Sequence, residues 1–140
     1  MSKKEKNKKH LAEIIKLFVV KEKRDRFLSF IESPKRYDDF LDELLNDPRN
    51  LDPESIIEIS NNEQAPEIIL NKLQKLGASN LAYVVSLDRD ADGKIGNLRE
   101  IIFSEVGHSI GTIIYCVGSA LGYYEDHENF RYILDAVPKL

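Results

Sequence analysis

Cysteine is almost absent from this chain: Cys116 is the single one among 140 residues, and tryptophan is missing. One cysteine excludes an intramolecular disulfide and a thiolate metal cluster within the chain. Cys116 lies in the apolar run GTIIYCVG, which is typical of a buried strand. We therefore expect a reducing compartment and a cytoplasmic location.

Long apolar runs are missing as well. The N-terminal stretch KKEKNKKHLAEIIKLFVVKEK starts basic, as a secretion signal does, but Glu13 and Lys16 interrupt its apolar part. No run approaches the roughly 18 to 20 apolar residues that span a bilayer. The sequence thus predicts neither a secretion signal nor a membrane span.

Motifs that mark the common enzyme classes are also missing. The chain has no G-x-S-x-G, no phosphate-binding glycine loop, no HExxH and no paired zinc ligands, so an enzyme is not the favoured interpretation. His108 and Ser109 follow a predicted helix, with Glu105 three residues upstream. A small hydrolase or nuclease that uses His108 with a carboxylate is therefore an alternative. A histidine that only interacts with the helix dipole is the simpler interpretation.

The charges are unevenly distributed along the chain. The net charge is −4, yet residues 1–31 hold ten Lys/Arg and only four Asp/Glu, so the rest of the chain is acidic. This asymmetry indicates either a basic arm for nucleic acid or anionic lipid, or a helix that docks on its own acidic domain, which we favour. The segment KKEKNKKHLAEIIK lacks the arginines and aromatic rings that stack on single-stranded nucleic acid. Nucleic acid is therefore not an expected partner.

The composition predicts one globular domain over residues 1–140, with 42% hydrophobic and 31% charged residues. Residues 1–9 are expected to form a basic, flexible tail, residues 10–76 to be mainly helical, and residues 80–136 to be strand-rich. Apolar spacing predicts helices over 11–31, 34–46 and 66–76. The phase of the first one shifts at 21–26, which leaves open one long helix or two. Residues 54–64 predict a short extended or irregular segment, although Asp52, Pro53 and Glu54 also suit the start of a helical turn.

The second half predicts strands around NLAYVVSLD, GTIIYCVG, ALGYYED and FRYILDA, with one helix over NLREIIFSEVG. Because that helix separates the first two of these strands, we expect a right-handed parallel crossover between them. The predicted fold is α+β: N-terminal helices, a strand–helix–strand unit and a hairpin, giving a three- or four-stranded mixed sheet covered by helices.

The stretch SLDRDADGKIGNLRE contains a candidate calcium loop. Asp88, Asp90, Asp92 and Gly93 match the first half of an EF-hand loop, in which alternate side chains wrap oxygen ligands around Ca²⁺. The twelfth position, where a bidentate glutamate closes the site, is Arg99, and Glu100 comes one residue late. We favour a solvated connection between a strand and a helix. A weak calcium site at the three aspartates is the alternative.

A second polar cluster lies in YYEDHEN, where Glu125, Asp126, His127 and Glu128 are consecutive. Carboxylates and histidine bind hard metals, but adjacent strand residues point to opposite faces, so at most two of the four share an ion. A hairpin loop accounts for the cluster more simply.

Several segments together carry a resemblance: the acidic loop with its glycine, the helix after it, GTIIYCV, and the following LGYYED and RYIL. In their order they resemble a group of small bacterial α+β proteins to which no activity is assigned. The resemblance covers about the last hundred residues. It implies an α+β layout and a bacterial cytosolic setting, and it implies no function.

The sequence as a whole favours a non-enzymatic, cytosolic interaction module, such as an adaptor, a regulator or a toxin-neutralising immunity protein. Its acidic body suits a basic protein partner, with DDFLDELLND and DRDAD as the expected contact segments. A homo-oligomer is left open by the sequence.

Overall fold

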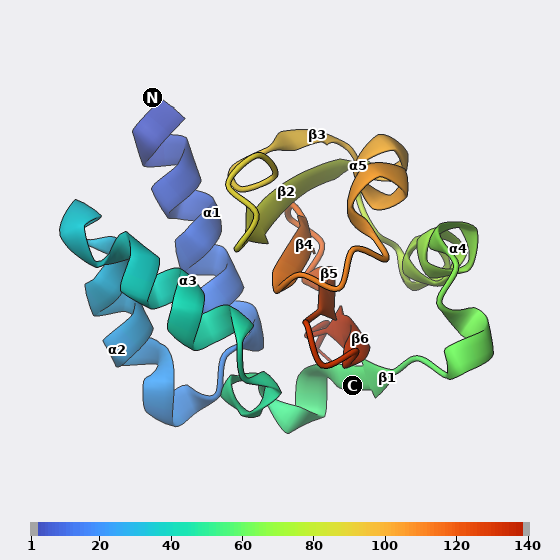
Figure 1. Cartoon of the computed structure of the whole chain (residues 1–140), viewed down its shortest axis with the longest axis horizontal. Helices are drawn as coiled ribbons and strands as arrows, with labels where there is room; N and C mark the ends of the chain where they lie inside the picture. Colours follow the sequence, from blue (N-terminus) through green and yellow to red (C-terminus); the bar gives the residue numbers. More distant parts are fainter. Residues whose placement is uncertain (1–2, 139–140) are drawn as a thin grey trace.

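The computed structural model describes residues 3–138 as a three-layer arrangement with one sheet between two groups of helices (Figure 1). The helices are α1 (Lys3–Phe18), α2 (Lys21–Ile31), α3 (Tyr37–Leu45), α4 (Pro66–Leu76) and α5 (Leu98–Glu105). The strands are β1 (Ile56–Glu58), β2 (Leu81–Ser86), β3 (Ile95–Asn97), β4 (Thr112–Cys116), β5 (Leu121–Glu125) and β6 (Arg131–Asp135). Their order in the sheet is β1-β6-β5-β4-β2-β3.

Both faces of the sheet are covered, which explains the continuous apolar runs of the central strands. On β2, Tyr83 and Val85 pack with α1, α2 and α3, whereas Ala82 and Val84 pack with α4 and α5. Successive strand residues point to opposite faces, so a strand that is buried on both sides needs apolar residues at every position. Two hydrophobic cores result, one on each side of the sheet.

The α+β class is confirmed, but the mixed sheet and the parallel crossover are wrong. The sheet has six strands in the described residues, every pair is antiparallel, and β2 lies directly beside β4 with Val84 opposite Ile114. The reason is β3, which pairs with β2 as a hairpin and reverses the chain before α5 begins. Because the chain reverses direction once more than predicted between β2 and β4, these two strands run antiparallel. The segment 54–64, expected as extended or irregular, contains the edge strand β1, which pairs with β6.

The predicted helices are confirmed, with changes at their ends. The first one is two helices: the chain leaves α1 at Phe18, and Val19 forms a bridge with Leu51 before α2 begins. A short 3₁₀ turn precedes α3, and the side chain of Ser33 makes no cap hydrogen bond there. Gly77 ends α4 with φ of 101°, a left-handed conformation that glycine adopts without strain. Residues 3–9 of the predicted tail lie in the first turns of α1, and residues 1–2 lie outside the described range.

None of the helices in residues 3–138 combines the length and the apolar character that crossing a membrane requires.

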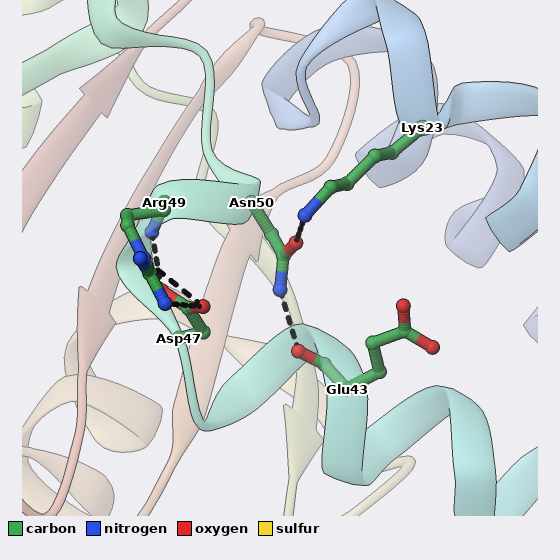
Figure 2. A network of polar contacts seen from close by, with 5 residues as sticks. All are labelled: Lys23, Glu43, Asp47, Arg49 and Asn50. Carbon is green, nitrogen blue, oxygen red and sulfur yellow. Dashed lines mark hydrogen bonds and ion pairs between the residues drawn. The ribbon is translucent and has the colours of Figure 1, made fainter.

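A small polar network holds α2 and α3 together and so fixes where α3 lies (Figure 2). The amide of Asn50 is almost fully buried; its Nδ2 donates to the Glu43 carbonyl at 2.6 Å, and its Oδ1 accepts from Lys23 Nζ at 2.7 Å. Arg26 on α2 adds two hydrogen bonds to the Glu43 carboxylate. A buried amide whose donor and acceptor are both used orients its neighbours. The C-terminal part of α3, around Glu43, is positioned in this way.

Candidate functional site

A cleft of about 770 Å³ lies between the N-terminal half of α1, the α2–α3 connection and the β2–β3 loop. Its walls are mainly apolar and aromatic, with a few charged or amide groups. The lining residues are Asn7, Lys8, Leu11, Ile31, Glu32, Ser33, Pro34, Tyr37, Tyr83, Asp92 and Gly93. A mainly apolar cleft with a few polar groups is the usual form of a ligand site.

A hydrogen bond between Tyr37 and Asp92 forms the polar part of the cleft. The Tyr37 hydroxyl donates to Asp92 Oδ2 at 2.6 Å, and the Ser86 amide donates to Asp92 Oδ1 at 3.0 Å. Tyr37 is the first residue of α3, whereas Asp92 lies in the β2–β3 loop, 55 residues later. The contact therefore connects the helical half of the chain to the sheet.

The β2–β3 loop is folded so that Asp92 points inward. The amides of Ala91 and Asp92 donate to the Asp88 carbonyl, which makes a single helical turn after β2. Gly93 then takes φ of 83° and donates its amide to the Val84 carbonyl, which returns the chain toward β3. A positive φ of this kind suits glycine, because a side chain would strain it. The inward direction of Asp92 is thus set by the backbone of the loop.

Burial shifts the protonation of all three ionisable groups around this contact. It raises the pKa of Asp92 above its ordinary value, although the hydrogen bonds from Tyr37 and Ser86 act in the opposite direction. Burial and the Asp92 carboxylate together raise the pKa of Tyr37 and of Tyr83 far above the usual range. Both phenols therefore stay protonated at neutral pH. Tyr37 acts as a hydrogen-bond donor and has no role as a base.

The rest of the cleft is built from α1 and the end of α2. The ring of Tyr83 lies 4.9 Å from the imidazole of His10, measured between ring centroids, and both side chains are buried. At the mouth, Lys8 on α1 pairs with Glu32, which follows α2. The packed rings of Tyr83 and His10 thus close one side of the cleft, and the Lys8–Glu32 ion pair spans its opening.

The three aspartates of the predicted calcium loop lie in different surroundings and do not converge on one point. Asp88 Oδ1 accepts from the Asp90 amide at 3.0 Å, Asp90 is exposed, and Asp92 points to Tyr37. Among the described side chains, those of residues 7–138, no three of His, Cys, Asp or Glu are grouped so as to hold a metal ion. The sequence predicts that this loop connects a strand to a helix, and this prediction is wrong. The loop connects β2 to β3, which pair as a hairpin, and α5 begins only after β3. A calcium site at Asp88, Asp90 and Asp92 stays a prediction that would require new hydrogen bonds in the loop.

The YYEDHEN cluster holds loops together through two buried carboxylates. Glu125 accepts from the amides of Gly107 and Ser109 at 2.8 and 2.9 Å, and from the Tyr123 hydroxyl at 2.9 Å. Asp126 accepts from the Tyr124 hydroxyl and from the amides of Glu128 and Phe130. Each carboxylate is about 1% exposed. Buried charges surrounded by donors in this way stabilise a turn, as the hairpin interpretation proposed.

His108 and Glu105 do not form the pair that a hydrolase or nuclease would use. The Glu105 carboxylate is buried and accepts from Lys94 Nζ at 3.0 Å and from the Ser104 hydroxyl at 2.9 Å. His108 is exposed and is absent from the lining of the cleft. Ser109 donates its hydroxyl hydrogen to Asn129 at 3.1 Å. The predicted catalytic alternative therefore gains no geometric support.

Sequence reasoning missed the cleft because its residues are far apart in the chain. In the sequence, Tyr37 falls among the apolar positions of the predicted helix 34–46, and Tyr83 falls in the apolar run of the predicted strand NLAYVVSLD. A tyrosine at an otherwise apolar position carries a signal, since a buried hydroxyl usually has a hydrogen-bond partner. That signal predicts an acceptor near Tyr37 without indicating that it is Asp92.

Comparisons of the chain with protein-family models, with curated proteins and with solved structures found no match.

Proposed function

We propose that the protein is a non-enzymatic, cytosolic interaction module that binds a basic partner protein where α3 meets the β2–β3 loop. One observation carries this proposal. The Tyr37–Asp92 hydrogen bond places the acidic segment of α3 beside the acidic loop, although the two are separate in the sequence. We call this region the acidic surface; it consists of Asp38, Asp39, Asp42, Asp88 and Asp90.

The charges of the acidic surface are largely free to face a partner. Asp38, Asp42 and Asp90 are exposed, and none of them forms an ion pair with a side chain of residues 7–138. Asp39 is partly neutralised by Arg36, whose Nε lies 3.7 Å from its carboxylate. Like charges that are held close together raise the local potential, attract an oppositely charged surface and speed its association.

The proposal is tested with a fluorescent decapeptide of alternating arginine and alanine, whose binding is followed by anisotropy at low salt. The variant Asp38→Asn with Asp90→Asn removes two charges from the acidic surface. At about 0.7 kcal/mol for each exposed charge, the loss of both charges costs about 1.4 kcal/mol, so affinity should fall about tenfold. The matched control is Glu100→Gln with Glu128→Gln, which changes the net charge equally at exposed positions on other elements.

The control variant should change the affinity for the peptide less than about twofold, because salt screens charges that lie far from the bound peptide. Equal losses in both double variants would mean that the peptide responds to net charge alone. Amide chemical shifts of the protein measured with the same peptide locate the contact, and shifts that avoid α3 and the β2–β3 loop would refute the proposal.

A further inference from the structure

We propose that the cleft receives an arginine side chain of the basic partner, with its guanidinium on the Asp92 carboxylate beside Tyr37 and Tyr83. This inference rests on the proposed function and adds the chemical group that is recognised. The cleft and the acidic surface are continuous, because Asp92 and Tyr37 line the cleft while their chain neighbours Asp90 and Asp38 belong to the surface.

The first argument is that Asp92 is a half-buried carboxylate without a cation. Its two oxygens accept one hydrogen bond each, from Tyr37 and from Ser86. A carboxylate has about four acceptor positions, so lone pairs are left for a donor entering the cleft. Among the side chains of residues 7–138, no Lys, Arg or His forms an ion pair with it. Burial without a counter-charge disfavours the ionised form, and a bound cation would remove this cost.

The second argument is that the described lining offers no free cation for this position. Among the lining residues whose side chains the structure describes, 7–138, the positively charged one is Lys8, and its ammonium group is paired with Glu32. Together with Asp92, these three charges give the described lining a formal charge of −1. One incoming cation would neutralise it, which is the complementarity expected of a specific contact.

The third argument concerns the shape of the cation. The cleft combines a carboxylate with the half-buried ring of Tyr37, and a planar guanidinium both stacks on an aromatic ring and donates two parallel hydrogen bonds. A lysine ammonium has no plane to stack. The molecule already uses arginine in this way elsewhere: the guanidinium carbons of Arg26 and Arg36 lie 4.9 and 4.5 Å from the centroid of the Phe30 ring.

The size of the cleft indicates what surrounds the arginine. About 770 Å³ is more space than one side chain fills, and Leu11, Ile31 and Pro34 provide apolar walls. Apolar residues beside the arginine would bury these walls and add affinity. The recognised segment is therefore an arginine flanked by apolar residues.

The test compares two fluorescent peptides, acetyl-Leu-Leu-Arg-Leu-Leu-amide and the same peptide with citrulline, a neutral isostere of arginine. A hydrogen bond to a charged group contributes about 1.5–3 kcal/mol. The arginine peptide should therefore bind about ten- to a hundredfold more tightly. It should also shift the amide signals of Gly93, Tyr83 and Leu11. In the Asp92→Asn variant the difference between the peptides should disappear.

The other possible results of this experiment each contradict one part of the inference: the guanidinium, the cleft or the partner side chain. Equal affinity of the two peptides for the unmodified protein, a comparison that needs no variant, overturns the recognition of the guanidinium. Shifts at Asp38 and Asp90 without shifts at Gly93 and Tyr83 overturn the cleft and leave the proposed function standing. Binding of free arginine amide as tight as that of the peptide overturns the partner side chain as the occupant. Absence of shifts on this whole face refutes both proposals.

Discussion

Replacing Tyr37 by phenylalanine removes one hydroxyl and leaves the rest of the α3 interface intact. The hydroxyl donates to Asp92 Oδ2 at 2.6 Å, and removing it leaves a half-buried carboxylate with only the Ser86 amide as donor. A hydrogen bond to a charged group contributes about 1.5–3 kcal/mol, and partial exposure lowers this value. We therefore expect a loss of about 1–2 kcal/mol in the free energy of unfolding at pH 7, measured by urea denaturation.

The pH dependence of this loss follows from the direction of the Asp92 shift. Burial holds the pKa of Asp92 above its ordinary value, so the folded state binds the proton more tightly than the unfolded chain. Ionisation of Asp92 thus costs stability as the pH rises through its folded pKa. The Tyr37 hydroxyl lowers that pKa, and its removal raises the pKa further. The destabilisation by Tyr37→Phe should therefore be larger at pH 7 than at pH 4.

A double-mutant cycle with Asp92→Asn separates the contact from other effects of the substitution. In the Asp92→Asn background the loss caused by Tyr37→Phe should shrink to below about 0.5 kcal/mol, because the charged acceptor is gone. The reasoning is refuted if the two substitutions are additive, or if the loss from Tyr37→Phe is equal at the two pH values. The contact would then be incidental to the position of α3.

Two further predictions concern buried positions outside the cleft. Glu125→Ala leaves three hydrogen-bond donors without their acceptor and should lower the free energy of unfolding by about 3–5 kcal/mol, measured by urea denaturation. Glu128 is exposed in the same turn, so Glu128→Ala should leave the free energy of unfolding almost unchanged. Similar losses in the two variants would contradict the stabilising role of the buried Glu125 carboxylate. Gly111→Ala places a methyl group 2.6 Å from the Leu45 carbonyl oxygen and should lower the thermal midpoint by several degrees. Gly96→Ala, where the nearest atom is 3.7 Å away, serves as its control, and the packing argument fails if both alanine variants melt alike.

The direction of β4 illustrates how a short strand decides a topology. The periodicity around Val84 and Ile114 predicts both strands correctly, because alternation over five or six residues is a local property. Whether the two strands run parallel depends on how many times the chain reverses between them. The three residues of β3 are too few to produce a recognisable pattern, yet their pairing with β2 adds the reversal that makes the sheet antiparallel.

The acidic loop illustrates the same limit at the level of a site. Its aspartates alternate before a glycine, and this spacing alone suits a metal loop, a turn or a binding surface equally. Asp92 differs from Asp88 and Asp90 because α3 brings the Tyr37 hydroxyl to it. The local pattern contains no information about a helix that lies more than forty residues earlier in the chain.

The sequence by itself determined the positions of the helices and of the longer strands, the α+β class, the buried state of Cys116 and the polarity of charge along the chain. These properties depend on neighbours within a few turns or strand residues, so periodicity, caps and composition carry them. Only the tertiary structure decided the antiparallel sheet, the contact between α3 and the β2–β3 loop through Tyr37 and Asp92, and the cleft between α1, α3 and the β2–β3 loop. Each of these requires residues far apart in sequence to meet, and the position of α3 that brings them together is set by packing and by the buried amide of Asn50.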